Sequence, residues 1–276
     1  MIISDLKRLA HMDWRTITPQ RIITALYSRL KQIPLLVSWH LQSDQNIKTL
    51  LKYRDAHKGE RCFIIGNGPS LKNMDLTLLK NEVTFGMNRI YLLFNKMGFK
   101  TTYHVVTNSL VVEQFLDEIK EINVPSFVPW KHRKLFTDKD NYSFMFNSYN
   151  EDFSTDITKF FGNGATVTYN CLHLAYYMGF KEVYLIGIDH NFPEKGIGKV
   201  VTSSGEDKNH FDPNYFGKGI KWGLANLPQS ERAYKLAKNT YEKQGRDIFD
   251  ATINGKLDIF DKIDFYSLFS NKQPLK

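Results

Sequence analysis

The 276-residue sequence has only two cysteines, Cys62 and Cys171, which stand far apart. Neither belongs to a Cys-x-x-Cys pattern. This excludes the disulfide framework of small secreted domains and a cysteine-based metal site. We expect both thiols to be reduced, as they are in the cytoplasm.

Long apolar runs are also missing. No stretch approaches the roughly 18 apolar residues that a bilayer-spanning helix needs, although 42% of the residues are hydrophobic. Residues 1–8 lack the apolar core and the small-residue cleavage site of a secretory signal. We therefore expect a cytoplasmic protein that is not embedded in a membrane.

Signatures of metal and nucleic-acid binding are lacking too. His104 and His132 have no second ligand at a recognisable spacing. Asp138-Lys139-Asp140 matches the Asp-x-Asp pattern with which many glycosyltransferases hold a divalent ion, but no apolar strand leads into it. We interpret it as a solvated loop. The pI near 9.2 suits nucleic acid, yet no known nucleic-acid-binding motif is present. We predict no metal site and no nucleic-acid partner.

The net charge of +8 is concentrated near the N-terminus. Up to Arg61 there are eleven lysines and arginines against five acids, which gives six of the eight net charges. We predict a basic helical arm over residues 1–57 and a catalytic domain over residues 58–276.

The arm contains an amphipathic helical pattern that Pro34 interrupts. Its apolar face would carry Ile22, Ile23, Leu26, Tyr27, Leu30 and Ile33, with Arg21, Arg29 and Lys31 on the polar side. Residues 35–41 add an apolar and aromatic patch. Such an arm suits an anionic membrane surface, here the inner membrane face, where a lipid-linked acceptor is presented. Alternatively it packs on its own domain or on a second subunit.

Residues 58–276 alternate strand and helix patterns. This alternation predicts an α/β fold with a doubly wound, mostly parallel, Rossmann-like sheet. The expected strands are 62–65, 83–88, 102–108, 125–128, 142–146 and 181–187. The expected helices are 109–122, 166–178 and 230–244, with Gly179 and Gly245 ending the last two.

A glycine turn, Gly66-Asn67-Gly68-Pro69-Ser70, follows the first strand. Its glycines allow a sharp turn and a close approach of a ligand, and the amides of the next helix start favour anions. It is not a Walker loop, because it lacks the Gly-Lys-Ser/Thr ending. The alternative is a purely structural turn, with Ser70 or Asp75 as a helix cap.

Polar residues also follow three later strands. Asn88 and Asn108 end the second and third strands, and Asp189 follows the strand at 181–187. Because ligands gather at the carboxyl ends of parallel strands, we predict a pocket there, with the asparagines on a base or ribose edge. The alternative for each side chain is a helix cap or a backbone contact.

The segment from 190 to 226 is too long for a tight connection and is interpreted as a substrate lid, with plain disorder as the alternative. Its exit carries His210, Tyr215 and Lys218. An imidazole, a phenol and a lysine can deprotonate an acceptor hydroxyl and stabilise a departing phosphate. His210 is the candidate base.

The blocks at 66–71, 88, 108–110, 166 and 178–189 together resemble the bacterial lipooligosaccharide sialyltransferases. They also resemble a broader set related to 6-hydroxymethylpterin diphosphokinase and the flagellin motility accessory factors, to which 210–217 is more similar. The resemblance covers about residues 60 to 265. It departs from the sialyltransferases in two ways: Lys218 stands where they carry a histidine base, and no tyrosine directly follows Asp189.

The resemblance implies a glycosyltransferase that moves a sialic-acid-like (nonulosonic) or related acidic sugar from a CMP-sugar donor to a cell-surface glycan acceptor, with no cofactor required for the chemistry. Gly66, Asn67, Gly68, Pro69, Ser70, Asn88, Asn108, Thr166 and Asp189 would hold the donor. His210 would act as base, Tyr215 would bind the leaving phosphate, and Lys218 would add positive charge. The alternatives are ATP-dependent pyrophosphoryl transfer to a pterin, with magnesium on Asp189 and Asp212, and a non-catalytic nucleotide-binding module in glycan assembly.

Overall fold

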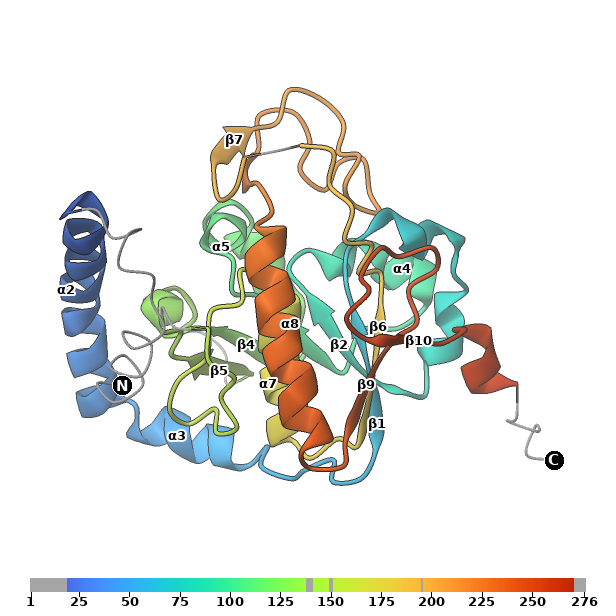
Figure 1. Ribbon diagram of the computed structural model, residues 1–276, viewed down its shortest axis with the longest axis horizontal. Coiled ribbons are helices and arrows are strands. Elements are labelled where there is room, and N and C mark those ends of the chain that lie inside the picture. Colours follow the sequence, from blue (N-terminus) through green and yellow to red (C-terminus); the bar gives the residue numbers. More distant parts are fainter. Residues whose placement is uncertain (1–18, 138–140, 149–150, 195, 271–276) are drawn as a thin grey trace. The chain divides into compact units, whose positions relative to one another are not determined.

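A computed structural model describes residues 19–137, 141–148, 151–194 and 196–270 (Figure 1). The chain divides into two compact units, Met1–Asp44 and Gln45–Lys276. The predicted Asp138-Lys139-Asp140 loop lies outside the described residues. No helix in the described ranges combines the length and the apolar character that crossing a bilayer requires.

The described part of the first unit is one long helix, α2 (Pro19–Gln42). It continues through Pro34, so the predicted interruption there is wrong. A proline removes one N–H donor and crowds the carbonyl four residues earlier, which strains a helix but does not always end it. Apolar side chains are exposed along α2, namely Tyr27, Leu30, Ile33, Val37 and Leu41. The side chains of Arg21, Ile22, Ile23, Leu26, Arg29 and Lys31 lie outside the described ones.

The second unit is built on an eight-stranded sheet in which every neighbouring pair is parallel. The strand order is β10-β9-β6-β1-β2-β3-β4-β5. The strands are β1 (Arg61–Ile65), β2 (Val83–Met87), β3 (Tyr103–Val105), β4 (Ser126–Pro129), β5 (Tyr142–Met145), β6 (Glu182–Ile186), β9 (Asp247–Asp250) and β10 (Asp261–Lys262). The predicted doubly wound, Rossmann-like fold is confirmed, and β1 to β6 fall where the sequence placed them.

The strand order reverses between β1 and β6. From β1 the chain adds β2 to β5 on one side, and it then returns to place β6, β9 and β10 on the other. Ligands of open α/β sheets bind outside such a reversal. The two loops meet there, because the Gly66 N–H donates to Ile186 O (2.7 Å) and the Gly68 N–H donates to Gly187 O (2.9 Å).

Two long helices cover one face of the sheet. Helix α7 (Val167–Tyr177) packs on β1, β2 and β3, and α8 (Leu227–Glu242) packs on α7 and β9 (Figure 1). The predicted helix ends are confirmed, since Gly179 (φ 90°) follows α7 and Gly245 (φ 63°) follows α8. Left-handed backbone at these positions is strained for any residue with a Cβ.

Short helices cover the other face. They are η2 (Pro69–Asn73), η3 (Leu76–Leu79), η4 (Ile90–Leu93) and α4 (Phe94–Met97), whose apolar residues share a buried cluster with Phe63 and Ile65 of β1. The predicted helix at 109–122 is two helices, α5 (Ser109–Gln114) and α6 (Leu116–Glu121). They are separated at Phe115, whose φ of −131° is not helical.

The predicted lid contains an antiparallel hairpin of β7 (Val200–Thr202) and β8 (Lys221–Gly223), seen above the sheet in Figure 1. Gln114 attaches it to α5. The side-chain amide of Gln114 accepts from Lys221 N (2.9 Å) and donates to Lys221 O (2.8 Å), as a neighbouring strand would.

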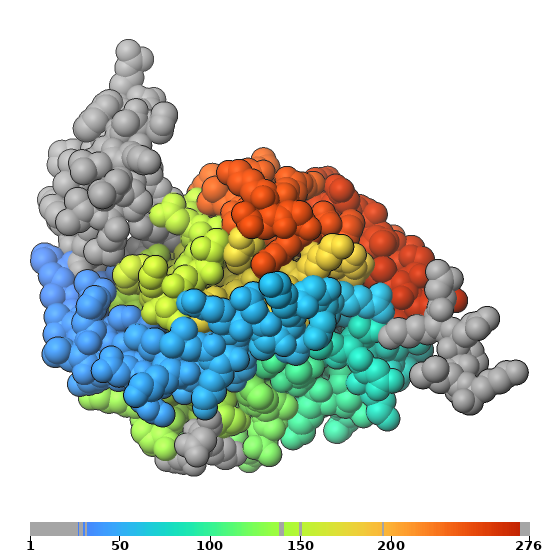
Figure 2. All heavy atoms as spheres, turned by 90° about the horizontal axis from the view of Figure 1, so that it is seen from below, coloured from blue at the N-terminus to red at the C-terminus, as the bar shows by residue number. Residues whose placement is uncertain are grey.

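The end of α7 farthest from the lid is held by the segment at 52–60, which follows α3 (Asp44–Leu51). Backbone N–H groups of Asp55, His57 and Gly59 donate to Tyr177, Met178 and Gly179 carbonyls at 2.8–3.1 Å. Figure 2 shows this blue segment running across that end of the unit. These bonds satisfy carbonyls that a helix C-terminus leaves free. The remaining elements are η5 (Trp130–Leu135) and η6 (Tyr266–Phe269).

Candidate functional site

A cavity of about 200 Å³ lies at the carboxyl ends of β1, β2, β3 and β6, at the reversal of strand order. The structure brings most of the predicted site residues to it. Gly66, Asn67, Gly68, Asn88, Asn108, Thr166, Asp189 and His210 line the cavity. Residues from the ends of four strands thus line one common pocket.

The glycines of the turn are required by close packing. A Cβ on Gly66 would stand 2.3 Å from Gly187 O, and one on Gly68 would stand 1.7 Å from Asp189 Oδ2. Both distances are far below van der Waals contact. The absence of side chains therefore lets the loops after β1 and β6 close the floor of the cavity together.

Three asparagines of the cavity lining each have a buried amide oxygen without a hydrogen-bond partner. These are Oδ1 of Asn67, Asn88 and Asn209, all buried atoms. The Asn67 and Asn209 side chains belong to residues only 8% and 7% exposed. Buried polar atoms are nearly always paired in folded proteins, so these three amides are the candidate contacts of the lining for N–H or O–H donors.

Asn88 and Asn108 also have structural roles. Asn88 has a left-handed backbone (φ 49°), a conformation that asparagine tolerates better than most residues. Its carbonyl contacts Nε2 of the buried His104 at 2.7 Å. Asn108 caps α5, because its Oδ1 accepts from the Leu110 N–H at 3.0 Å. The capping alternative therefore holds for Asn108, although the residue still lines the cavity.

Asp189 holds the glycine turn in place. Its two oxygens accept from the Ser70 N–H (3.0 Å) and the Ser70 hydroxyl (2.7 Å). Burial raises the pKa of Asp189 and outweighs these hydrogen bonds, which lower it. Pro69 and Ser70 begin η2 behind the turn and do not line the cavity. Both carboxylate oxygens of Asp189 therefore already accept a hydrogen bond from Ser70 before any ligand binds.

Two helices begin at the cavity. Thr166 caps α7, with its hydroxyl accepting from the Thr168 N–H (3.3 Å), and Asn226 caps α8 through the Gln229 N–H (3.2 Å). Neither first turn contains an acidic residue. The positive ends of two helix dipoles therefore face a cavity lined by Thr166 and Leu227, which favours an anionic ligand.

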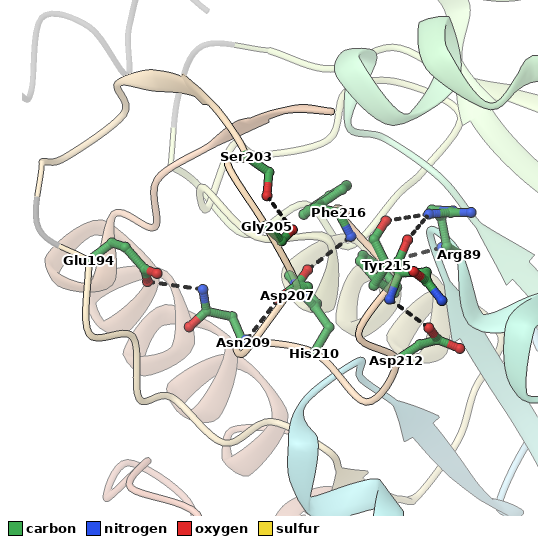
Figure 3. A network of polar contacts seen from close by, with 11 residues as sticks. Arg89, Glu194, Ser203, Gly205, Asp207, Asn209, His210, Asp212, Tyr215 and Phe216 are labelled. Carbon is green, nitrogen blue, oxygen red and sulfur yellow. Dashed lines mark hydrogen bonds and ion pairs between the residues drawn. The ribbon is translucent and has the colours of Figure 1, made fainter. Parts of the chain in front are cut away.

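His210 enters the cavity from the lid. Its Nδ1 lies 2.7 Å from Asp207 Oδ2, and its ring stacks on Tyr215 with centroids 4.0 Å apart and planes at 7°. Figure 3 shows Asp207 between the lid residues that it connects. The sequence did not single out Asp207, because a loop carries no periodicity that would show which acid faces the imidazole.

Tyr215 and Lys218 are not brought to the cavity. Tyr215 is completely buried behind His210, and its hydroxyl accepts from the Arg89 N–H at 3.2 Å. Burial raises the pKa of Tyr215 far above its usual range. Lys218 is exposed on the lid. Of the three predicted catalytic residues, only His210 lines the cavity.

Arg89, which sequence analysis missed, anchors the lid from below. Its guanidinium donates to the carbonyls of Asn214 (3.0 Å) and Tyr215, and pairs with Glu118 (3.2 Å). It also lies 3.7 Å from the centre of the Phe115 ring. Its position directly after Asn88, at a strand end, was the only signal for it.

The two aspartates considered as magnesium ligands do not come together in a ligand group. Asp189 is bonded to Ser70, whereas Asp212 Oδ1 accepts from the Asn214 N–H (2.8 Å) away from the cavity lining. Across the described ranges, no three His, Cys, Asp or Glu side chains are grouped so that they could hold a metal ion.

Comparison with known proteins identifies the family of this chain. Residues 40–195 match the model of the family described as 6-hydroxymethylpterin diphosphokinase MptE-like. The chain belongs to this family. The matched range contains β1 to β6, α7 and the glycine turn, whereas His210 and most of the lid follow it.

A solved structure also matches the chain. It is that of the MAf glycosyltransferase from Magnetospirillum magneticum AMB-1, with 15% sequence identity and a TM-score of 0.48. The match covers 80% of this MptE-like chain and 38% of the other. The chain thus spans well under half of that protein's length. No match was found among curated proteins.

Proposed function

We propose that this MptE-like protein transfers a nonulosonic or related acidic sugar from a CMP-sugar donor to a glycan acceptor. The observation that carries the proposal is that three residues of the cavity lining, Asn67, Asn88 and Asn209, each have an amide oxygen without a hydrogen-bond partner. Ribose hydroxyls and the amino group of cytosine are donors of the kind these oxygens lack.

The electrostatics of the cavity support an anionic donor. The starts of α7 and α8 and the amides of the glycine turn all favour negative charge. A CMP-linked acidic sugar carries a phosphate and a carboxylate, so it presents two groups for these positions.

In the proposed reaction His210 is the general base. Nε2 removes the proton of the acceptor hydroxyl, and the acceptor oxygen forms a bond to the anomeric carbon of the sugar. The bond between that carbon and the phosphate oxygen breaks, and its electron pair leaves with CMP. No cofactor is required. Tyr215 supports the His210 ring from behind, in place of the phosphate contact that the sequence suggested.

The acceptor in this proposal is a glycan or lipid-linked glycan. The exposed apolar residues of α2 support contact with a membrane surface, at the cytoplasmic face in the proposed setting. Packing against a second copy of the chain is the competing role for this helix.

The family description favours a second candidate, ATP-dependent pyrophosphoryl transfer to a pterin alcohol. A pterin also carries N–H donors that suit the asparagines. That reaction would use magnesium and acidic ligands. The separate hydrogen-bonding roles of Asp189 and Asp212 give this candidate less support. A non-catalytic nucleotide-binding module in glycan assembly is the third.

A thermal-shift panel tests the donor. CMP without added metal should raise the Tm, since a ligand at about 100 times its Kd adds about 2.7 kcal/mol of stability. Asn88→Gly removes the amide but keeps the left-handed backbone unstrained, and it should abolish most of the shift. Asn239→Ala, at an exposed position of α8, is the matched control. Stabilisation by ATP with magnesium, and not by CMP, would overturn the proposal in favour of pyrophosphoryl transfer.

A further inference from the structure

Asp207 has an environment unlike that of the other acids on the lid. Its side chain is only 4% exposed, and it accepts three hydrogen bonds. These come from His210 Nδ1 (2.7 Å), the Asn209 N–H (2.8 Å) and the Phe216 N–H (3.0 Å) (Figure 3). One carboxylate therefore fixes both the loop backbone and the imidazole.

We propose that Asp207 is a positioning residue that holds His210 in the tautomer protonated on Nδ1, so that Nε2 keeps its lone pair for a proton in the cavity. An ionised carboxylate only accepts hydrogen bonds, so the ring nitrogen 2.7 Å away must carry the hydrogen. The catalytic step rests on the proposed function, whereas the tautomer does not.

The ring has little freedom to turn away from this arrangement. One face of the ring stacks on Tyr215, with the two ring centroids 4.0 Å apart. The Phe216 ring packs edge-to-face, with its centroid 5.0 Å from that of His210 and the two planes at 83°. Tyr215 is itself fixed, because its hydroxyl accepts from the Arg89 N–H and its carbonyl accepts from the Arg89 guanidinium. The imidazole is thus held by packing, and Asp207 then selects which nitrogen is protonated.

The negative charge of Asp207 suits this role. Burial alone would raise the pKa of its carboxyl, but the hydrogen bond and charge of His210 and the two backbone N–H groups outweigh burial and lower it. The carboxylate is therefore ionised at neutral pH. It can stabilise the imidazolium that forms when Nε2 accepts a proton.

The other charged groups around the cavity are bonded elsewhere. Arg89 lies beyond Tyr215 and pairs with Glu118. His190, which lines the cavity, pairs with Glu231 at 3.0 Å, and Asp189 is bonded to Ser70. Asp207 is the carboxylate that bonds the His210 ring itself.

The test is the tautomer of His210, measured by ¹⁵N NMR of the ring nitrogens in the full-length protein without substrate, at a pH where the ring is neutral. The wild type should show the Nδ1–H form. Asp207→Asn keeps the size of the side chain but removes the charge, and it should shift the population toward the Nε2–H form. Asp212→Asn is the matched control, because Asp212 lies on the same loop and its carboxylate accepts only from the Asn214 N–H among the contacts described above.

Turnover provides the second readout. Asp207→Asn should lower kcat by about 10-fold or more with a donor KM within about two-fold of wild type, whereas Asp212→Asn should change neither. An Nε2–H form in the wild type overturns the inference even if the variant does not fold. So does an unchanged tautomer in a folded Asp207→Asn. If no CMP-sugar is consumed, the proposed function fails, and the tautomer still decides the role of Asp207.

Discussion

At the scale of single residues, the proposed chemistry depends on His210, which lines the cavity, and not on Lys218, which lies exposed on the lid. His210→Ala should reduce sugar transfer by about 10²-fold or more, in line with general-base contributions of roughly 10²–10⁴. Donor binding, measured by thermal shift, should stay near that of the wild type.

Lys218→Ala is the control, and it should retain most of the activity. The opposite pattern, an inactive Lys218→Ala beside an active His210→Ala, would assign His210 a structural role. It would also make Lys218 the functional group at the position where the sialyltransferases carry their histidine base.

Most of the predicted site residues line the cavity because strand ends carry information in their sequence. A buried strand followed by a glycine or an asparagine identifies one rim of a parallel sheet, and this brought Gly66, Asn88, Asn108 and Asp189 together. Their individual roles were not accessible. For example, Asp189 accepts a hydrogen bond from Ser70, which lies on a loop distant in sequence. No local pattern encodes such a contact.

Among the strands, those marked by apolar runs were predicted and the others were not. Strands β1 to β6 lie in apolar runs with clear breaks, and these include the three-residue β3, whereas β8 (Lys-Trp-Gly) and β10 (Asp-Lys) are mostly polar. Such strands form because a neighbour is already present. In helix α2 the opposite mistake was made. Pro34 was expected to interrupt the helical pattern, but the long helix continues through it.

Helix α2 is the element for which membrane contact is predicted. The full-length protein should bind vesicles containing anionic lipid at low salt and release them as salt rises, because screening acts over about 8 Å at physiological ionic strength. Leu30→Glu, which places a charge on the exposed apolar face, should weaken binding in a sedimentation assay.

Leu236→Glu provides the matched control for this assay, since Leu236 is a partly exposed leucine on α8. It should leave vesicle binding unchanged. If the wild type stays in solution at low salt, α2 instead serves in packing or self-association.

At the scale of the whole molecule, two buried histidines make stability depend on pH. Burial lowers the pKa of His104 and of His173 to about 4, against hydrogen bonds that raise it. The unfolded chain binds these protons at about pH 6.5, so between pH 6.5 and 4 it holds more protons than the native state. The contribution of these two neutral histidines to the free energy of unfolding is therefore fully present above pH 6.5. It is lost as the pH drops toward 4, by at most about 3 kcal/mol per histidine.

Denaturant melts at pH 7.5, 6 and 5 would measure this loss. His173→Asn should flatten the dependence, although it lowers stability at neutral pH, whereas the exposed His40→Gln should leave the slope unchanged. A melt midpoint that does not move between pH 7.5 and 5 would show that the two imidazoles are not held neutral.

The reversal of strand order between β1 and β6 has a consequence for how the protein folds. Strands β1 to β5 pair with neighbours close in sequence, but β6 must return from residue 182 to pair with β1 at residue 61. Closing so long a loop is slow, because its entropy is lost before the pairing compensates. The cavity floor, where Gly66 meets Gly187, is formed only by that late event. A nascent chain can therefore not hold its ligand until the second half of the sheet has been synthesised and docked.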